Sequence, residues 1–128
     1  RVQVVEVSVD AGNVHVHNVH CFIDCGRCVN PNIIHQQIEG SVIFGLSAAL
    51  YEQISLKDGA AANSNFHDYR VARLSESPEV FVSIIENDEA PGGVGEPGVL
   101  PVVPALCNAI YAATGKGIHR LPVASQLI

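Results

Sequence analysis

The longest helical pattern in the chain runs NPNIIHQQIEGSVIFGLSAALYEQ over residues 30–53. Asn30-Pro31 is a helix-start pair, because an asparagine side chain caps exposed backbone amides and proline fits the first turn without losing a hydrogen bond. Apolar residues then fall near one side of a helix: Ile34, Ile38, Val42, Leu46, Ala49 and Leu50. The sequence therefore predicts a helix over about residues 32–53.

Another side of this helix is thin, because it carries Gly40, Ser41, Gly45 and Ala48. Glycine inside a helix costs about 1 kcal/mol relative to alanine, so two glycines indicate that something approaches this side closely. Neighbouring backbone and a bound cofactor are the two candidates. Gln37 lies one turn ahead of Gly40, and its amide offers both a donor and an acceptor to a ligand. Taken alone, a glutamine at such a position is more often simply exposed.

A β-hairpin is predicted before the helix. Apolar and polar residues largely alternate over residues 2–9 and again over residues 14–25, and residues 10–13 between them have turn chemistry. Because successive strand side chains point to opposite faces, one face of the second strand carries Val19, Cys21, Ile23 and Cys25.

The remaining segments complete an α+β pattern. They are a short strand at 54–56, a turn at 57–59, a polar irregular stretch at 63–69, a strand at 80–86, a loop at 90–98 and a helix from Val103 or Pro104 to Ala113. Both faces of the strand at 80–86 are expected to be at least partly buried. The fold class is therefore α+β, with a hairpin, a long helix, further strands and a second helix.

Composition excludes several functions. With 128 residues, 48% hydrophobic and 16% charged, the chain is expected to pack as one domain or part of one. A formal net charge of −6 and scattered basic residues argue against nucleic acid. The apolar runs are too short to span a membrane. Because the chain lacks methionine and begins with Arg1, we interpret it as a processed or clipped piece of a longer polypeptide.

Glu96 is the strongest candidate for chemistry. It stands between Gly95 and Pro97 in the glycine-rich loop at residues 90–98. Proline pushes the preceding residue into an extended conformation, and glycine lets backbone approach a ligand closely. A carboxylate fixed in this way can act as a general base. On local pattern alone, a solvated glutamate in a surface turn is an equal alternative.

The cysteines suggest a rival metal site. Cys21, Cys25 and Cys28 have the C-x3-C-x2-C spacing of an iron–sulfur cluster, and the last two also form a redox-type C-x-x-C. However, Cys21 and Cys25 would lie roughly 13 Å apart along an extended strand, whereas the ligands of a cluster converge. Buried cysteines that behave as small apolar residues are therefore favoured. The histidines have no recognised metal spacing either, so no metal ligand is assigned.

Four segments in order carry a resemblance to a known family. They are Asp24-Cys25-Gly26 with Val29-Asn30-Pro31, Gln37-Ile38-Glu39-Gly40 with Gly45-Leu46, NFHDYR at residues 65–70, and Gly93-Val94-Gly95-Glu96-Pro97. This order resembles the last part of the molybdopterin-binding subunit of molybdenum hydroxylases, the xanthine dehydrogenase and aldehyde oxidase family. Within it, the likeness is to the bacterial isoquinoline 1-oxidoreductase β-subunit type.

The resemblance implies a molybdopterin-dependent oxidoreductase that hydroxylates an aldehyde or N-heterocycle with oxygen from water. It implies that Glu96 is the general base, that Gln37 contacts the cofactor, and that Gly93 and Gly95 let the loop close over the metal centre. The cofactor is expected in its cytosine dinucleotide form, with iron–sulfur clusters on a partner domain or subunit. Residues 1–128 are expected to be the C-terminal portion of a single, incomplete molybdopterin-binding domain, as part of a larger layered one. The expected partners are the rest of the subunit, an iron–sulfur subunit and a small-molecule substrate. The alternative is an isolated fragment or structural module without metal or activity.

Overall fold

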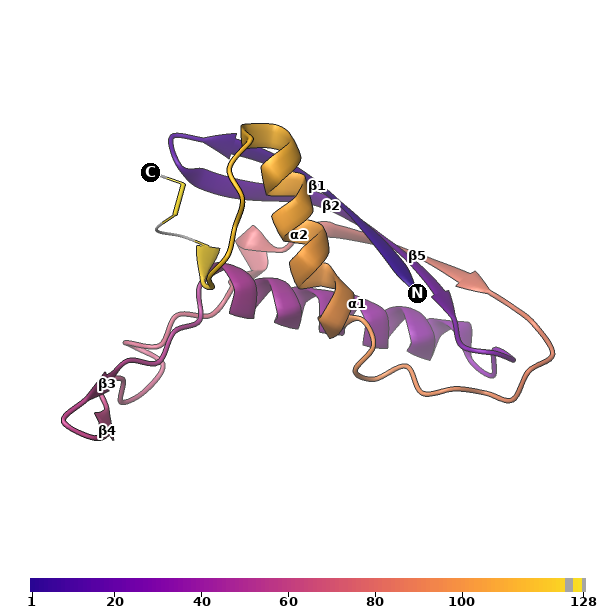
Figure 1. Ribbon diagram of the computed structural model, residues 1–128. Coiled ribbons are helices and arrows are strands. Elements are labelled where there is room, and N and C mark those ends of the chain that lie inside the picture. The colour runs from indigo at the N-terminus through magenta and orange to yellow at the C-terminus, as the bar shows by residue number, and fades with distance from the viewer. Residues whose placement is uncertain (124–125, 128) are drawn as a thin grey trace.

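The computed structural model describes residues 1–123 and 126–127. A sheet forms one layer, and both long helices lie against the same face of it (Figure 1). The elements follow in the order β1 (Val2–Asp10), β2 (Asn13–Asp24), α1 (Pro31–Leu50), β3 (Leu56–Lys57), β4 (Ala60–Ala61), the 3-10 turn η1 (Leu74–Glu76), β5 (Glu79–Ile85) and α2 (Val99–Thr114). The predicted α+β fold class is confirmed.

The predicted hairpin is present as β1 and β2, which pair in antiparallel fashion. Its turn places Ala11 at φ 45° and Gly12 at φ 82°. Two successive residues with positive φ give the turn a twist that matches the flanking strands, and glycine adopts this conformation without strain. The hairpin therefore forms at the position that the turn residues indicate.

The third strand of the sheet is β5, which pairs with β2 in parallel, so that the order is β1-β2-β5. Val80 lies beside Val19, and Ile84 lies beside Ile23. Parallel neighbours require a long crossover connection, and α1 with the segment after it provides this connection. The β2–α1–β5 unit brings the end of β2 and the end of β5 to the same edge of the sheet.

Helix α1 begins where it was predicted and ends earlier. The Asn30 side chain accepts a hydrogen bond from the Ile33 amide at 3.2 Å, and Pro31 is the first helical residue. The predicted end at residue 53 is wrong, since the helix stops at Leu50 and Tyr51 leaves the helical conformation with φ −132°.

Glu52 explains this early end. Its carboxylate accepts hydrogen bonds from the Ser47 hydroxyl at 2.5 Å and from the Tyr69 hydroxyl at 2.7 Å. The Ser47 carbonyl accepts both the Tyr51 and the Glu52 amides, at 3.0 Å and 3.3 Å. These bonds turn the chain out of the helix and tie it to the segment that follows.

Helix α2 starts several residues before its predicted start. Pro101 lies in the first turn, where backbone N–H groups have no intrahelical partner in any case, so it does not delay the helix. Pro104 lies inside the helix. The predicted glycine stop is confirmed, because Gly115 adopts φ 72° and donates its N–H to the Tyr111 carbonyl at 2.7 Å. Within the described residues, neither helix is both long and apolar enough to cross a membrane.

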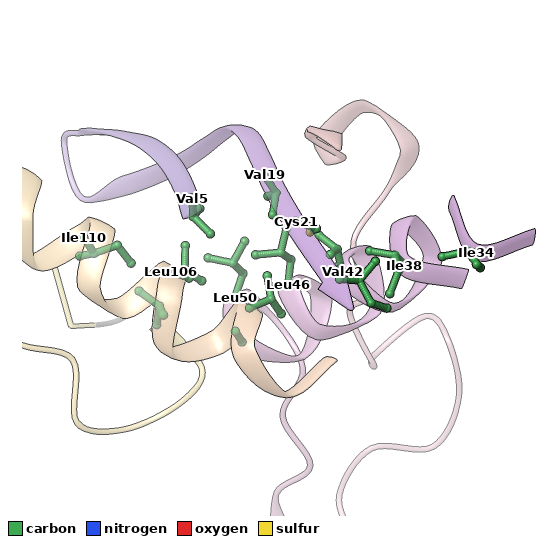
Figure 2. Close-up of a cluster of buried hydrophobic side chains, with 14 of the residues drawn as sticks. Val5, Val19, Cys21, Ile34, Ile38, Val42, Leu46, Leu50, Leu106 and Ile110 are labelled. Atoms are coloured by element: carbon green, nitrogen blue, oxygen red, sulfur yellow. The ribbon is translucent and has the colours of Figure 1, made fainter. Parts of the chain in front are cut away.

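The core lies between the sheet and the two helices (Figure 2). Its largest fully buried side chains are Val19 and Ile23 from β2, Ile38 and Val42 from α1, Val102, Leu106 and Ile110 from α2, and Val123 from the segment after α2. No helix among the residues that the structure describes covers the other face of the sheet. For that reason the expectation that both faces of β5 are partly buried is wrong for this chain, where Phe81 is 41% and Ile85 53% exposed.

The segment between α1 and β5 projects from the body as an arm with the small β3–β4 hairpin at its end (Figure 1). Asp68 organises the segment that follows β4, because its carboxylate accepts hydrogen bonds from the backbone N–H groups of Ser64 and Asn65 at 2.9–3.0 Å. The N–H groups of Asn65 and Ser64 lower the pKa of Asp68. The irregular, polar stretch predicted at residues 63–69 is thus held by side-chain hydrogen bonds.

Candidate functional site

The loop that carries Glu96 leaves β5 and returns beneath α1 to α2 (Figure 1). Its first half is bound to the turn that follows β2. The Gly92 amide donates to the Cys25 carbonyl at 2.8 Å, and the Arg27 amide donates to the Glu89 carbonyl at 3.0 Å. This contact joins the Asp24-Cys25-Gly26 motif to the part of the loop that directly precedes Gly93.

Gly26 makes the contact between turn and loop close. It adopts φ +73°, and a Cβ at this position would lie 2.3 Å from the Ala90 carbonyl oxygen. Asp24 fixes the turn, because its Oδ1 accepts the Gly26 amide at 3.1 Å and the Asn87 side-chain amide at 2.8 Å. The Asp24-Cys25-Gly26 motif therefore holds the first half of the loop in place.

The second half of the loop is held by Arg1, by Gln3 of β1 and by its own turn. The guanidinium of Arg1 donates to the Gly93 carbonyl at 2.8 Å, and the Gln3 side chain donates to the Gly98 carbonyl at 3.0 Å. The Val99 amide donates to the Glu96 carbonyl at 3.0 Å. The backbone of Glu96 is thus fixed, whereas its side chain is exposed and accepts no hydrogen bond from the described residues.

Helix α1 packs closely against the start of α2. A Cβ on Gly45 would lie 2.4 Å from Cγ1 of Val102 and 3.2 Å from the backbone carbonyl oxygen of Val99. A Cβ on Gly98 would lie 1.8 Å from the hydroxyl oxygen of Ser41. Of the two explanations for the thin side of the helix, neighbouring backbone therefore accounts for Gly45. It does not account for Gly40, where a Cβ would meet nothing within 4 Å.

Gln37 lies beside the loop. Its Oε1 is 3.9 Å from the position that a Cβ would take on Gly95, and its side chain is exposed. Gly93 is also exposed, and a Cβ there would meet nothing within 4 Å. The structure thus brings Gln37 and the Gly95-Glu96 pair to one surface, although they come from separate elements.

Sequence reasoning missed three residues that shape this surface, namely Arg1, Gln3 and Asn87. Each contacts a partner between 63 and 95 residues away in the sequence. No local pattern marks them, because an arginine, a glutamine and an asparagine are ordinary in strands and loops. Only the pairing of β1, β2 and β5 makes these contacts possible.

Comparison with known proteins decides the family. Residues 1–78 match the model of the molybdopterin cofactor-binding domain. The chain belongs to this family. The match contains β1, β2, α1 and the arm, and the Glu96 loop follows it in the sequence.

Proteins similar to this molybdopterin cofactor-binding domain are much longer. The isoquinoline 1-oxidoreductase subunit beta of Brevundimonas diminuta is 40% identical over 88% of this chain, which covers 14% of that protein. The putative xanthine dehydrogenase molybdenum-binding subunit of Escherichia coli is 36% identical over 83% of this chain, which covers 15% of that protein. The solved aldehyde oxidoreductase of Desulfovibrio desulfuricans has a TM-score of 0.79 at 25% identity, over 91% of this chain and 14% of that one.

These comparisons confirm the resemblance to the molybdopterin-binding subunits of molybdenum hydroxylases. The chain spans about one-seventh of the length of the relatives it matches. The expectation that its α+β fold is part of a larger layered domain agrees with the size of the structural neighbour.

Three cysteines of this molybdopterin cofactor-binding domain, Cys21, Cys28 and Cys107, have raised pKa values, which favour the thiol form. Burial raises the pKa of Cys21 to about 11 and also raises that of Cys107. The pKa of Cys28 is raised by desolvation and further by Glu86 and Cys25. A metal would need the thiolate form. Across residues 1–123 and 126–127, no three His, Cys, Asp or Glu side chains converge as metal ligands.

Proposed function

We propose that this chain is part of a molybdenum-dependent hydroxylase that inserts oxygen from water into an aldehyde or an N-heterocycle. Glu96 is its general base. The observation that carries the proposal is the closeness of the Gln37 side chain to Gly95, the residue before Glu96. The backbone of this loop is hydrogen-bonded in both of its halves, whereas the Glu96 side chain is exposed. The names of the relatives, which include an isoquinoline oxidoreductase and an aldehyde oxidoreductase, support the substrate class.

The residues around Glu96 fit a molybdopterin cofactor. Gln37 offers an exposed amide that can both donate and accept hydrogen bonds. Gly40 and Gly93 leave open space where a side chain would otherwise stand, so a flat ligand can approach the backbone of α1 and of the loop. In this proposal Gln37 contacts the cofactor, and Gly93 and Gly95 let the loop close over its metal end.

Hydroxylation with water releases two protons and two electrons for each oxygen inserted into a C–H bond. When bound, the molybdenum cofactor supplies Lewis acidity and accepts the electron pair. The Glu96 carboxylate takes the proton that the water-derived nucleophile loses as it attacks the substrate carbon. A general base in this position contributes about 10²–10⁴-fold to the rate. The exposed carboxylate has no competing hydrogen bond from the described residues, so it is available for that proton.

The chain alone is expected to lack activity. Gln37, Gly93, Gly95 and Glu96 are all exposed, whereas a small-molecule site buries most of the surface of its ligand. Other walls of the site would come from the rest of the molybdopterin-binding subunit, of which residues 1–128 form the C-terminal portion of a domain. Iron–sulfur clusters on a partner domain or subunit would carry the electrons away, and the cofactor is proposed to be the cytosine dinucleotide form.

Turnover in ¹⁸O-labelled water tests the reaction. The enzyme that contains this chain is purified with its co-purifying subunits, and its molybdenum and pterin contents are measured. It is then supplied with an aromatic aldehyde, isoquinoline and xanthine in turn. We expect at least one hydroxylated product that carries the label. Oxygen taken from O₂ instead, or a chain that elutes as a lone monomer without molybdenum or pterin, would contradict the proposal and favour a structural module.

A further inference from the structure

The side-chain amide of Gln3 makes one hydrogen bond through its nitrogen, while its oxygen is buried without a hydrogen-bond partner among the described residues. Gln3 lies on β1 opposite Cys21 of β2, on the side of the sheet that faces the helices. Its Nε2 donates to the Gly98 carbonyl at 3.0 Å. Its Oε1 is buried and has no hydrogen-bond partner among the described residues.

The orientation of this amide follows from its partner. If the amide were flipped, Oε1 would face the carbonyl oxygen of Gly98, and two acceptors cannot share a hydrogen bond. The neighbouring Cys21 thiol is neutral at physiological pH, because burial raises its pKa to about 11. A buried acceptor without a partner destabilises the fold. An apolar side chain of equal length would avoid this cost, so stability alone does not explain a glutamine here.

Gly98 is held on two sides. Gln3 binds its carbonyl from the sheet, and Ser41 of α1 presses against its α-carbon, where a Cβ would lie 1.8 Å from the serine hydroxyl. Ser41 is itself fixed, because its hydroxyl donates to the Ile38 carbonyl at 2.8 Å. Gly98 ends the turn that the Val99 amide closes onto the Glu96 carbonyl. The position of the Glu96 backbone therefore depends on the contacts of Gly98 with Gln3 and Ser41.

We propose that Gln3 is a positioning residue for Glu96. Its Nε2–H bond to Gly98 sets the turn at residues 96–99 and so aims the Glu96 carboxylate at the reacting water. This inference rests on the proposed function of Glu96. A misplacement of a catalytic group by about 1 Å can cost about 100-fold in rate, so loss of this one hydrogen bond should be visible in turnover.

Gln3→Met in the assembled enzyme is the direct test. Methionine matches the length of glutamine but removes both the donor to Gly98 and the unsatisfied oxygen. We expect unchanged molybdenum content, a Tm equal to or above that of the parent, and a kcat lowered by about 10–100-fold with little change in KM. Hydrogen exchange of the Val99 amide should become faster. Gln53→Met is the matched control, since Gln53 is exposed beyond the end of α1, and it should change none of these quantities.

Three outcomes overturn the inference. A kcat near that of the parent shows that the hydrogen bond does not position the base. A lower kcat accompanied by lower Tm and lower molybdenum content shows a structural role only. If Gln3→Met does not fold, Gln3→Leu is judged by the same criteria, and failure of both to fold also indicates a structural role. Failure of the proposed function is distinguishable, because normal turnover in Glu96→Gln refutes the base itself whatever the behaviour of Gln3.

Discussion

Two alanine substitutions in α1 should differ in their effect on stability: Gly40→Ala should stabilise the chain, and Gly45→Ala should not. Both glycines lie inside the helix, so both variants gain the same helix propensity. Their surroundings differ, because a Cβ at position 45 would lie 2.4 Å from Cγ1 of Val102 and 3.2 Å from the Val99 carbonyl, whereas a Cβ at position 40 meets nothing within 4 Å. The difference in stability between the two variants therefore measures the contact between α1 and α2.

The expected magnitudes follow from two terms. Glycine to alanine inside a helix stabilises by about 1 kcal/mol, so Gly40→Ala should raise the free energy of unfolding by about that amount. A methyl group forced into a packed core costs about 1–3 kcal/mol. Gly45→Ala should therefore be neutral or destabilising by up to about 2 kcal/mol, which leaves a difference of about 1–3 kcal/mol between the variants.

Urea unfolding of the purified chain measures both changes, provided that the m-values stay the same. Val102→Ala completes a double-mutant cycle, because it removes the methyl group that the new Cβ would meet. In that background Gly45→Ala should become stabilising, like Gly40→Ala. If Gly45→Ala stabilises the parent chain as much as Gly40→Ala does, α2 does not pack at this position, and the placement of the Glu96 loop beside α1 loses its support.

Three further predictions concern the surface and the arm. In the assembled enzyme, Gln37→Ala should lower molybdenum occupancy, and full occupancy would argue against a cofactor contact. Because N–H groups lower the pKa of Asp68, its contribution to the arm is complete above the ordinary value of 3.8 and is lost as pH falls through the lowered pKa. An NMR titration of the Ser64 amide should have its midpoint below 3.8, and a midpoint above it would refute this. Cys28→Ser should leave the iron content unchanged, and a loss of iron would restore the cluster hypothesis.

The hairpin and α1 were predictable because their signals are local. Alternating residues, a turn with glycine and an Asn30-Pro31 cap all act within a few positions of one another. The start of α2 was not predictable in this way, because a proline can lie either in the first turn of a helix or before the helix begins. Pro101 lies in the first turn. The end of α1 depends on Glu52 and its bond to Tyr69, a contact across 17 residues that no helix signal contains.

The candidate site was predictable only in part. Glu96 and Gln37 were singled out from their local patterns and from the family resemblance. The closeness of Gln37 to the Glu96 loop depends on the packing of α1 against α2. The glycines of α1 predicted a close approach to this helix, but they did not show which element approaches it. Gln3 could not be found in the same way, because its significance comes from one hydrogen bond to Gly98, 95 residues away. Residues that position a loop carry no motif of their own.

The central claim is that Glu96 is the base of a hydroxylation. Its most direct test is the rate of the first turnover in Glu96→Gln, measured by rapid mixing with substrate at matched molybdenum content. Glu89→Gln is the control, because that exposed carboxylate belongs to the same connection between β5 and α2. We predict a fall of about 10²–10⁴-fold for Glu96→Gln and a parental rate for Glu89→Gln. A first turnover in Glu96→Gln as fast as that of the parent enzyme would contradict the assignment.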